Sequence, residues 1–149
     1  MRLSSAQKLL PWAPLAIRLS LGVIFLAHGA HQLFGVWDGP GLSEPITISN
    51  NRSITVYLSF IAGATEFLGG IAVAIGLLTR LAALALAFDM AAWIFKVQLV
   101  NGFFLNWSLL PGKGHGYEYN LALLAMSIAL FLSGPGKLAL DHVLGFEEN

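Results

Sequence analysis

The chain has 149 residues, of which 56% are hydrophobic and only 11% are charged. A soluble domain carries about 25% charged residues, so this composition favours a single domain whose solvent is the lipid bilayer. The eight basic and eight acidic residues cancel, which leaves no basic field to attract nucleic acid. The absence of cysteine excludes thiol–disulfide chemistry, iron–sulfur ligation and thiolate zinc sites from this chain.

Four apolar stretches are candidates for membrane spans, since a span needs about 20 mostly apolar residues. They are residues 14–34, 54–78, 81–100 and 117–133, the last being the shortest. Gly76 and the pair Thr79-Arg80 predict a tight link between the second and third spans. The two other connections are long and rich in Gly, Pro and Asn. We therefore expect an all-α integral membrane four-helix bundle with two long external loops, formed by the whole chain as one domain.

Basic residues in the flanks predict the orientation, because cytoplasmic flanks carry an excess of Lys and Arg. With four spans, both termini and the short link lie on one side. That side holds Arg2, Lys8, Arg80 and Lys137, and the other side holds Arg52 and Lys113. This bias predicts that both termini are cytoplasmic and that both long loops are external.

A cleaved signal peptide is the competing interpretation of the N-terminus. The chain has a basic start, an apolar run and Ala27-x-Gly29 as a cleavage context. Against it, Arg18 interrupts the apolar segment and Leu33-Phe34 extend it beyond the cleavage position. We therefore favour a first span that is retained.

Small residues and aromatic loop residues predict how the bundle packs. Ala83, Ala87 and Ala91 recur at every fourth position of the third span, and the second span pairs Gly70 with Ala74. Small residues at this spacing let membrane helices approach closely. Aromatic residues occur in both loops, 36–53 and 101–116, which are too long for simple connections. They are Trp37, Phe103, Phe104 and Trp107, and they predict a structured external cap.

Polar side chains interrupt the spans in a pattern that predicts a shared cavity. On a helix that turns about 100° per residue, Arg18, His28 and Gln32 fall in one sector of the first span. Most of the polar positions lie in the external half of the spans. The candidate cavity residues are Arg18, His28, Gln32, Glu66, Asp89, Lys96, Gln98 and Glu118. Phe25, Trp93 and Phe95 are the candidates for lining a slot for an aromatic ring.

Two interpretations of the buried charges remain open. Charged groups at bilayer depth turn inward and pair, and Arg18 with Lys96 would neutralise Glu66 with Asp89. Such pairs would be purely structural. The alternative is a ligand or proton site, which the neighbouring histidine and amide groups favour. In either case we expect His28 to bond a neighbouring helix, through Glu66 or Glu118.

Haem and metal ligation are not expected. Haem held between helices needs histidines on two spans, whereas His28 and His31 both lie on the first, and His115 and His142 lie outside the spans. His28 and His31 could supply two metal ligands, but the remaining ligands would have to be carboxylates. Two histidines this close in sequence are common in proteins, so the pair is weak evidence for a metal site.

Motifs spread along the chain resemble those of one known family. In order they are HGAHQLFG (28–35), GPGL (39–42), Glu66 in a Gly-rich span, GLLTRLAA (76–83), Met90, NGFF (101–104), GYEYNL (116–121) and GPGKLALD (134–141). Together they resemble the DoxX family of small four-helix membrane proteins, which is similar to the DoxD subunit of thiosulfate:quinone oxidoreductase. The resemblance implies the cytoplasmic membrane of a bacterium or archaeon, and members are often labelled quinone-linked oxidoreductases.

The resemblance also implies site positions. The matching polar residues are Arg18, His28, Glu66, Arg80, Glu118 and Asp141. Two positions depart from the family pattern: Gln32 stands where the family commonly has lysine, and Gln98 where it commonly has histidine. Each change removes a titratable group from the implied site.

Two functions are therefore expected as alternatives. The first is a quinone-linked oxidoreductase subunit or accessory protein, with bound quinone and with electrons supplied by a redox partner subunit, since the chain has no recognisable flavin, haem or iron–sulfur motif. The second is a non-enzymatic small subunit that stabilises a larger membrane complex, or that binds a lipid or solute.

Overall fold

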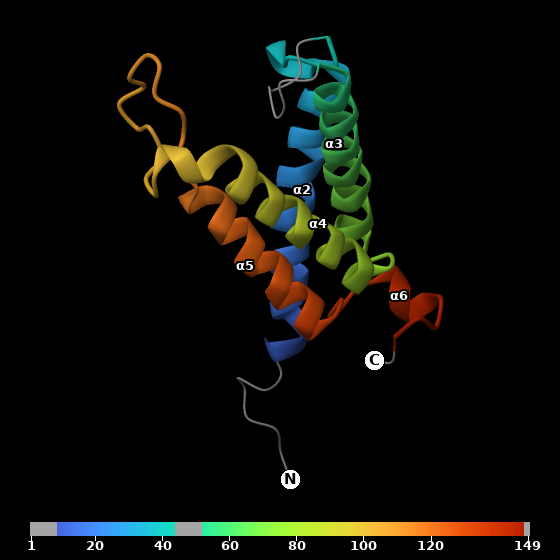
Figure 1. Cartoon of the computed structure of the whole chain (residues 1–149). Helices are drawn as coiled ribbons and strands as arrows, with labels where there is room; N and C mark the ends of the chain where they lie inside the picture. The colour runs from blue at the N-terminus through green and yellow to red at the C-terminus, as the bar shows by residue number, and fades with distance from the viewer. Residues whose placement is uncertain (1–8, 44–51, 148–149) are drawn as a thin grey trace.

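The computed structural model describes residues 9–43 and 52–147, with the side chains of 52–54 excepted, and these residues contain helices but no strand. The four long helices are α2 (Ala13–Phe34), α3 (Arg52–Ile75), α4 (Thr79–Trp93) and α5 (Glu118–Ser133). Figure 1 shows them side by side as a bundle. The predicted all-α four-helix architecture is confirmed.

Short elements extend or connect these helices. A π-helical turn, η3, and a 3-10 turn, η4, continue α4, while α6 follows α5 at the other end of the bundle. Their bounds are η1 (Leu10–Trp12), η2 (Val36–Asp38), η3 (Ile94–Gln98), η4 (Leu99–Asn101) and α6 (Leu140–Val143). The predicted link needs one correction, because Thr79 and Arg80 already belong to α4. The turn consists of residues 76–78, with Gly76 at φ 73°.

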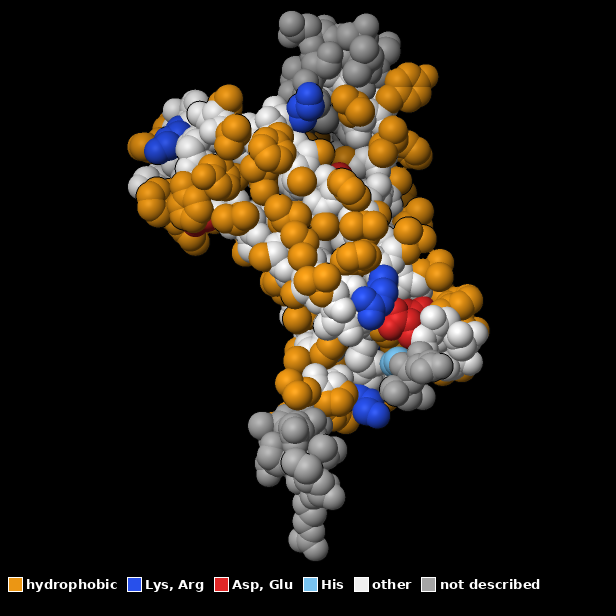
Figure 2. Space-filling model, turned by 60° about the horizontal axis from the view of Figure 1, so that its bottom comes forward, with side chains coloured by type: hydrophobic (Ala, Val, Ile, Leu, Met, Phe, Trp, Pro, Cys, Tyr) orange, Lys and Arg blue, Asp and Glu red, His pale blue; other side chains and the backbone are white. Residues whose placement is uncertain are grey.

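Three helical stretches are long and apolar enough to cross a membrane. They are Leu10–Phe34, Thr55–Ile75 and Thr79–Asn101. The fourth, α5, has 16 residues, which at 1.5 Å per residue span about 24 Å, less than the roughly 30 Å hydrocarbon core. Large apolar side chains point outward from all four long helices, and hydrophobic side chains dominate the face seen in Figure 2. A bilayer rather than water is the solvent that such a surface requires.

The helices pack mainly as two pairs, α2 with α3 and α4 with α5. The pairs lie together where α2 and α4 begin and diverge toward the upper part of Figure 1. We call the first the closed end and the second the open end. A core between the pairs includes Leu21, Val73, Leu86 and Leu130.

Glycines bring α2 and α3 into close contact. A Cβ on Gly29 would meet the backbone of Phe67, with its Cα at 2.7 Å, and a Cβ on Gly70 would lie 2.6 Å from the backbone nitrogen of Leu26. Contacts this short leave no room for any side chain. Close packing through small residues is therefore present between α2 and α3, where glycines of α2 act together with the predicted Gly70.

The segment after α5 forms hydrogen bonds that hold the helices together at the closed end. The Asp141 carboxylate accepts hydrogen bonds from the backbone N–H groups of Leu78 (2.6 Å) and Thr79 (2.9 Å), at the start of α4. Arg18 from α2 donates through Nη2 to the carbonyl of Leu138 at 3.0 Å. Both Arg18 and Asp141 are 1% exposed, and they lie within electrostatic reach of each other. One short segment thus joins α2 to the α3–α4 turn.

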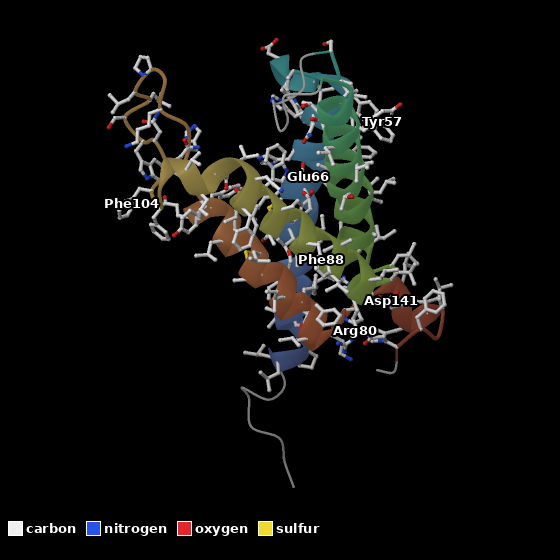
Figure 3. The ribbon with its side chains drawn as sticks, in the orientation of Figure 1. Tyr57, Glu66, Arg80, Phe88, Phe104 and Asp141 are labelled. Carbon is white, nitrogen blue, oxygen red and sulfur yellow. The ribbon has the colours of Figure 1, made fainter. Side chains whose placement is uncertain are left out.

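A second arginine ties the end of α5 to the same region. Arg80 donates through Nη1 to the carbonyls of Phe131 (2.5 Å) and Leu132 (3.1 Å). Its Nε pairs with the carboxylate of Glu147. Figure 3 shows Arg80 and Asp141 together at the lower end of the bundle.

Replacing Gly29 with Ala is expected to destabilise the bundle. The added methyl group would push α2 away from the Phe67 backbone, and overpacking of this kind costs about 1–3 kcal/mol of unfolding free energy. Reversible unfolding in mixed detergent measures the loss. Val23→Ala, on an exposed face of α2, is the matched control and should stay within about 0.5 kcal/mol of the wild type. Equal stability of the two variants would contradict the close α2–α3 contact.

Asp141→Ala is expected to lower the unfolding free energy by about 3–5 kcal/mol, because it removes the cap of α4 and leaves the buried Arg18 uncompensated. The same unfolding assay checks this. Glu147→Ala removes a more exposed carboxylate and should cost about 1 kcal/mol or less. A loss at Asp141 no larger than at Glu147 would rule out the closing role of this segment.

Candidate functional site

A cavity of about 810 Å³ lies between the two helix pairs in the half of the bundle toward the open end. All four long helices contribute to its wall. The lining residues are Phe25, His28, His31 and Gln32 of α2, Glu66 of α3, Met90, Trp93 and Gln98 of α4 and η3, and Tyr119, Asn120 and Leu123 of α5. Pro40 and the loop residues Leu105, Asn106, Trp107, Leu109 and His115 complete it.

The deepest lining side chains are apolar. Phe25, Met90 and Leu123 line the cavity and are each almost fully buried. Trp93 adds an indole ring to the same wall. An apolar, aromatic interior with a few polar groups is typical of a site for a small organic ligand.

Backbone carbonyls orient the two histidines of α2. Nδ1 of His28 lies 2.9 Å from the carbonyl of Ile24, and Nδ1 of His31 lies 3.0 Å from that of Val36. A ring nitrogen beside a carbonyl oxygen must carry the hydrogen, so a neutral ring leaves Nε2 as an acceptor. The prediction that His28 bonds a neighbouring helix is wrong, because its backbone partner is on its own helix. Across the cavity its ring faces that of Tyr119, with centroids 6.2 Å apart.

The loop between η4 and α5 is organised around one asparagine. The Asn106 side chain donates to the carbonyls of Leu110 (3.0 Å) and Lys113 (2.8 Å), and its backbone N–H donates to Nδ1 of His115 (3.3 Å). His115 in its neutral form therefore carries its hydrogen on Nε2 and offers a donor. The loop supplies part of the cavity wall, as the predicted cap requires, and carries Phe104 out to the upper left of Figure 3. Most of the other predicted cap segment, 44–51, lies outside the described residues.

The two glutamines at the departures from the family pattern have different roles. Gln32 donates to the carbonyl of Ser59 at 2.9 Å, which links α2 to α3. Gln98 donates to Oδ1 of Asn120 at 3.1 Å, while its own Oε1 is buried without a partner among the described residues. Gln98 therefore lines the cavity while its carbonyl oxygen stays buried beneath the wall.

Two acidic residues meet at the inner side of the cavity. The carboxyl groups of Glu66 on α3 and Asp89 on α4 share a hydrogen bond. Glu66 is 5% exposed and lines the cavity, and Figure 3 places it at mid-length of α3. A hydrogen bond between two carboxyl groups requires a proton on one of them. This arrangement replaces the predicted ion pairs, since Arg18 lies at the closed end and Lys96 is exposed on η3.

The structure brings together most, but not all, of the expected residues. Phe25, His28, Gln32, Glu66, Trp93 and Gln98 line the cavity, and Asp89 lies directly behind Glu66. Arg18, Phe95, Lys96 and Glu118 do not line it. The π-helical turn Ile94–Gln98 changes the angular position of successive residues, and Phe95 is 71% exposed. Glu118 begins α5, with its backbone N–H bonded to the carbonyl of Phe103.

Sequence reasoning missed four polar lining residues, Asn106, His115, Tyr119 and Asn120. The first two belong to a loop whose conformation the sequence pattern does not predict. The last two lie in the GYEYNL motif, directly after Glu118, the predicted cavity residue of that motif. The first turn of α5 places Tyr119 and Asn120, and not Glu118, at the cavity.

Comparison with known proteins agrees with this architecture. The DoxX family model matches residues 13–99, which covers α2 to α4. The chain is 33% identical over 138 residues to "Uncharacterized membrane protein Rv3486" of Mycobacterium tuberculosis, with 90% of this chain and 82% of that protein covered. It is 28% identical over 127 residues to "Putative oxidoreductase CatD" of Bacillus subtilis, with 85% and 83% covered. An "Uncharacterized protein" of Haemophilus influenzae is 27% identical over 141 residues, with 94% and 96% covered.

No solved structure matches the chain. The family assignment therefore depends on the family model and on the relatives. The model covers more than half of the chain, and the mycobacterial relative is aligned over nearly all of it. The chain belongs to the DoxX family of membrane proteins.

Proposed function

We propose that this protein is a quinone-binding membrane subunit or accessory protein of an oxidoreductase. The observation that carries the proposal is the cavity, whose volume of about 810 Å³ falls within the roughly 300–1,000 Å³ of small-ligand sites. Its apolar interior suits a ring and the start of a hydrophobic tail. The similarity to a relative named as an oxidoreductase supports the same conclusion.

The polar groups of the cavity fit the two redox forms of a quinone. Quinone carbonyls need hydrogen-bond donors, whereas the hydroxyls of the reduced form need acceptors. Nε2 of His115 is a donor, and Nε2 of neutral His28 is an acceptor. Phe25 and Trp93 supply aromatic surface for the ring. The residues present therefore fit this group.

A bound quinone would supply the capacity to take up two electrons and two protons. The residues of this chain bind and orient it, and the apolar walls limit access of water to the ring. Glu66 and His28 are placed to exchange protons with it. The electrons would come from a partner redox subunit that carries a flavin or an iron–sulfur cluster. We place the protein in the cytoplasmic membrane, with both termini on the cytoplasmic side, as the basic flanks indicate.

Replacing His28 with Gln is expected to weaken binding of a short-chain benzoquinone about tenfold, the equivalent of one hydrogen bond of about 1.4 kcal/mol. Quenching of tryptophan fluorescence in detergent measures binding, because Trp93 lines the cavity. The matched control is Lys96→Gln, which changes an exposed residue outside the cavity and should bind as the wild type does. Size-exclusion chromatography checks that both variants assemble alike.

Two results would contradict this proposal. Wild-type affinity in the His28 variant would remove this residue from the site. Failure of the wild type to bind any benzoquinone, together with co-purification of a stoichiometric membrane partner in mild detergent, would favour the non-enzymatic alternative.

A further inference from the structure

Four ionisable side chains, one from each long helix, form a line that starts behind the cavity wall and continues along it. Asp89 of α4 shares a hydrogen bond with Glu66 of α3. Glu66 lies within electrostatic reach of the Tyr119 hydroxyl on α5, and the Tyr119 ring faces that of His28 on α2. The line begins at the buried acid pair and ends at His28, which is exposed. It therefore connects the interior of the bundle with the cavity opening.

Among the side chains that the structure describes, no cation pairs with either acid. Among basic residues whose side chains the structure describes, Arg18 bonds the closing segment and Arg80 pairs with Glu147. Lys96 is exposed on η3. Two ionised carboxylates in contact and without a cation repel each other strongly in apolar surroundings. One proton held between the two carboxyl groups removes most of that repulsion and makes their hydrogen bond.

The geometry gives the two members of the pair different access to the cavity. Glu66 lines the cavity, whereas Asp89 does not. Oδ2 of Asp89 is buried and makes no hydrogen bond to the described residues, while the carboxyl group of Asp89 interacts with that of Glu66. Of the two acids, Glu66 is therefore the one placed to exchange a proton with the cavity. The other ionisable groups that line the cavity are His31 and His115.

We propose that Glu66 and Asp89 form an acid pair that stores one proton and exchanges it with the ligand in the cavity, with Tyr119 and His28 as the next groups toward the opening. The identity of the ligand rests on the proposed quinone function; the stored proton does not. Reduction of the quinone takes two electrons from the partner redox subunit and two protons. One O–H bond of the acid pair breaks as one forms on the ligand, and the second proton comes from water at the opening. Water then restores the proton of the pair.

Infrared difference spectroscopy of the protein in liposomes at neutral pH tests this proposal. The wild type should show the C=O stretching band of a protonated carboxyl group, and D₂O should shift that band because the cavity gives access to it. The double variant Glu66→Gln/Asp89→Asn should lose the band completely. Glu118→Gln, which changes an acidic residue outside the cavity, should keep it. If the double variant fails to assemble, the single variants Glu66→Gln and Asp89→Asn replace it, and each should shift or remove the band.

Adding a short-chain benzoquinone and then reducing it should change the frequency of this band. The proposal is overturned if the wild type shows no protonated carboxyl, if the band survives the double substitution, or if D₂O leaves it unmoved. A quinone that binds without changing the band would overturn the exchange step. If no quinone binds while the band and its D₂O shift are present, the quinone function fails and the proton-storing pair stands.

Discussion

The structure depends on the hydrogen bonds that join the helices at its closed end. Membrane helices gain little from hydrophobic association with one another, so close packing and polar contacts decide how they are arranged. Here the carboxylate of Asp141 caps α4, and the guanidinium of Arg18 holds the backbone of the same segment. These contacts bring α2, the α3–α4 turn and the segment after α5 together at one level. The two helix pairs are thereby joined at this end and are free to diverge at the other.

The divergence explains where the polar residues lie. A polar group in the middle of a closed bundle has to find every partner within the protein, whereas one beside a cavity can also meet water or a ligand. His28 and His31 stand in the second half of α2, beside the cavity, with Nδ1 of each ring held by a backbone carbonyl. The acid pair lies deeper, and of its two members Glu66 lines the cavity whereas Asp89 does not. The position of each group along its helix therefore matches the degree of hydration available to it.

The sequence predicts the architecture well because length and hydropathy alone determine which segments suit a bilayer. It predicts part of the cavity for a similar reason, since depth along a helix can be counted from the residue number. The prediction that Arg18 faces the cavity is wrong, because its depth along the helix does not reveal that the distant segment around Leu138 packs beside it. The prediction that Phe95 and Lys96 face the cavity is wrong, because the π-helical turn that contains them departs from the regular helical period.

The acid pair shows a different limit of sequence reasoning. Arg18 and Lys96 balance Glu66 and Asp89 in number, which suggested neutralisation by ion pairing. Balance in number does not imply contact, and in the structure the two acids meet each other instead. The proton that they share follows only from their proximity. The position of Tyr119 opposite His28 could not be predicted from the sequence either, because it depends on how α5 packs against α2.

The central claim is that a cavity open at one end separates two helix pairs that are joined at the other. The absence of native cysteine allows single-cysteine labelling to test it with no background. In proteoliposomes, a membrane-impermeant, water-soluble maleimide should label Gln98→Cys, in the cavity wall. It should not label Phe88→Cys, on an exposed apolar face of α4, or Leu21→Cys, in the core between the helix pairs. Protection of the Gln98 position to the same degree as the Leu21 position, in protein that is correctly assembled and accessible from both sides of the membrane, would contradict the open cavity.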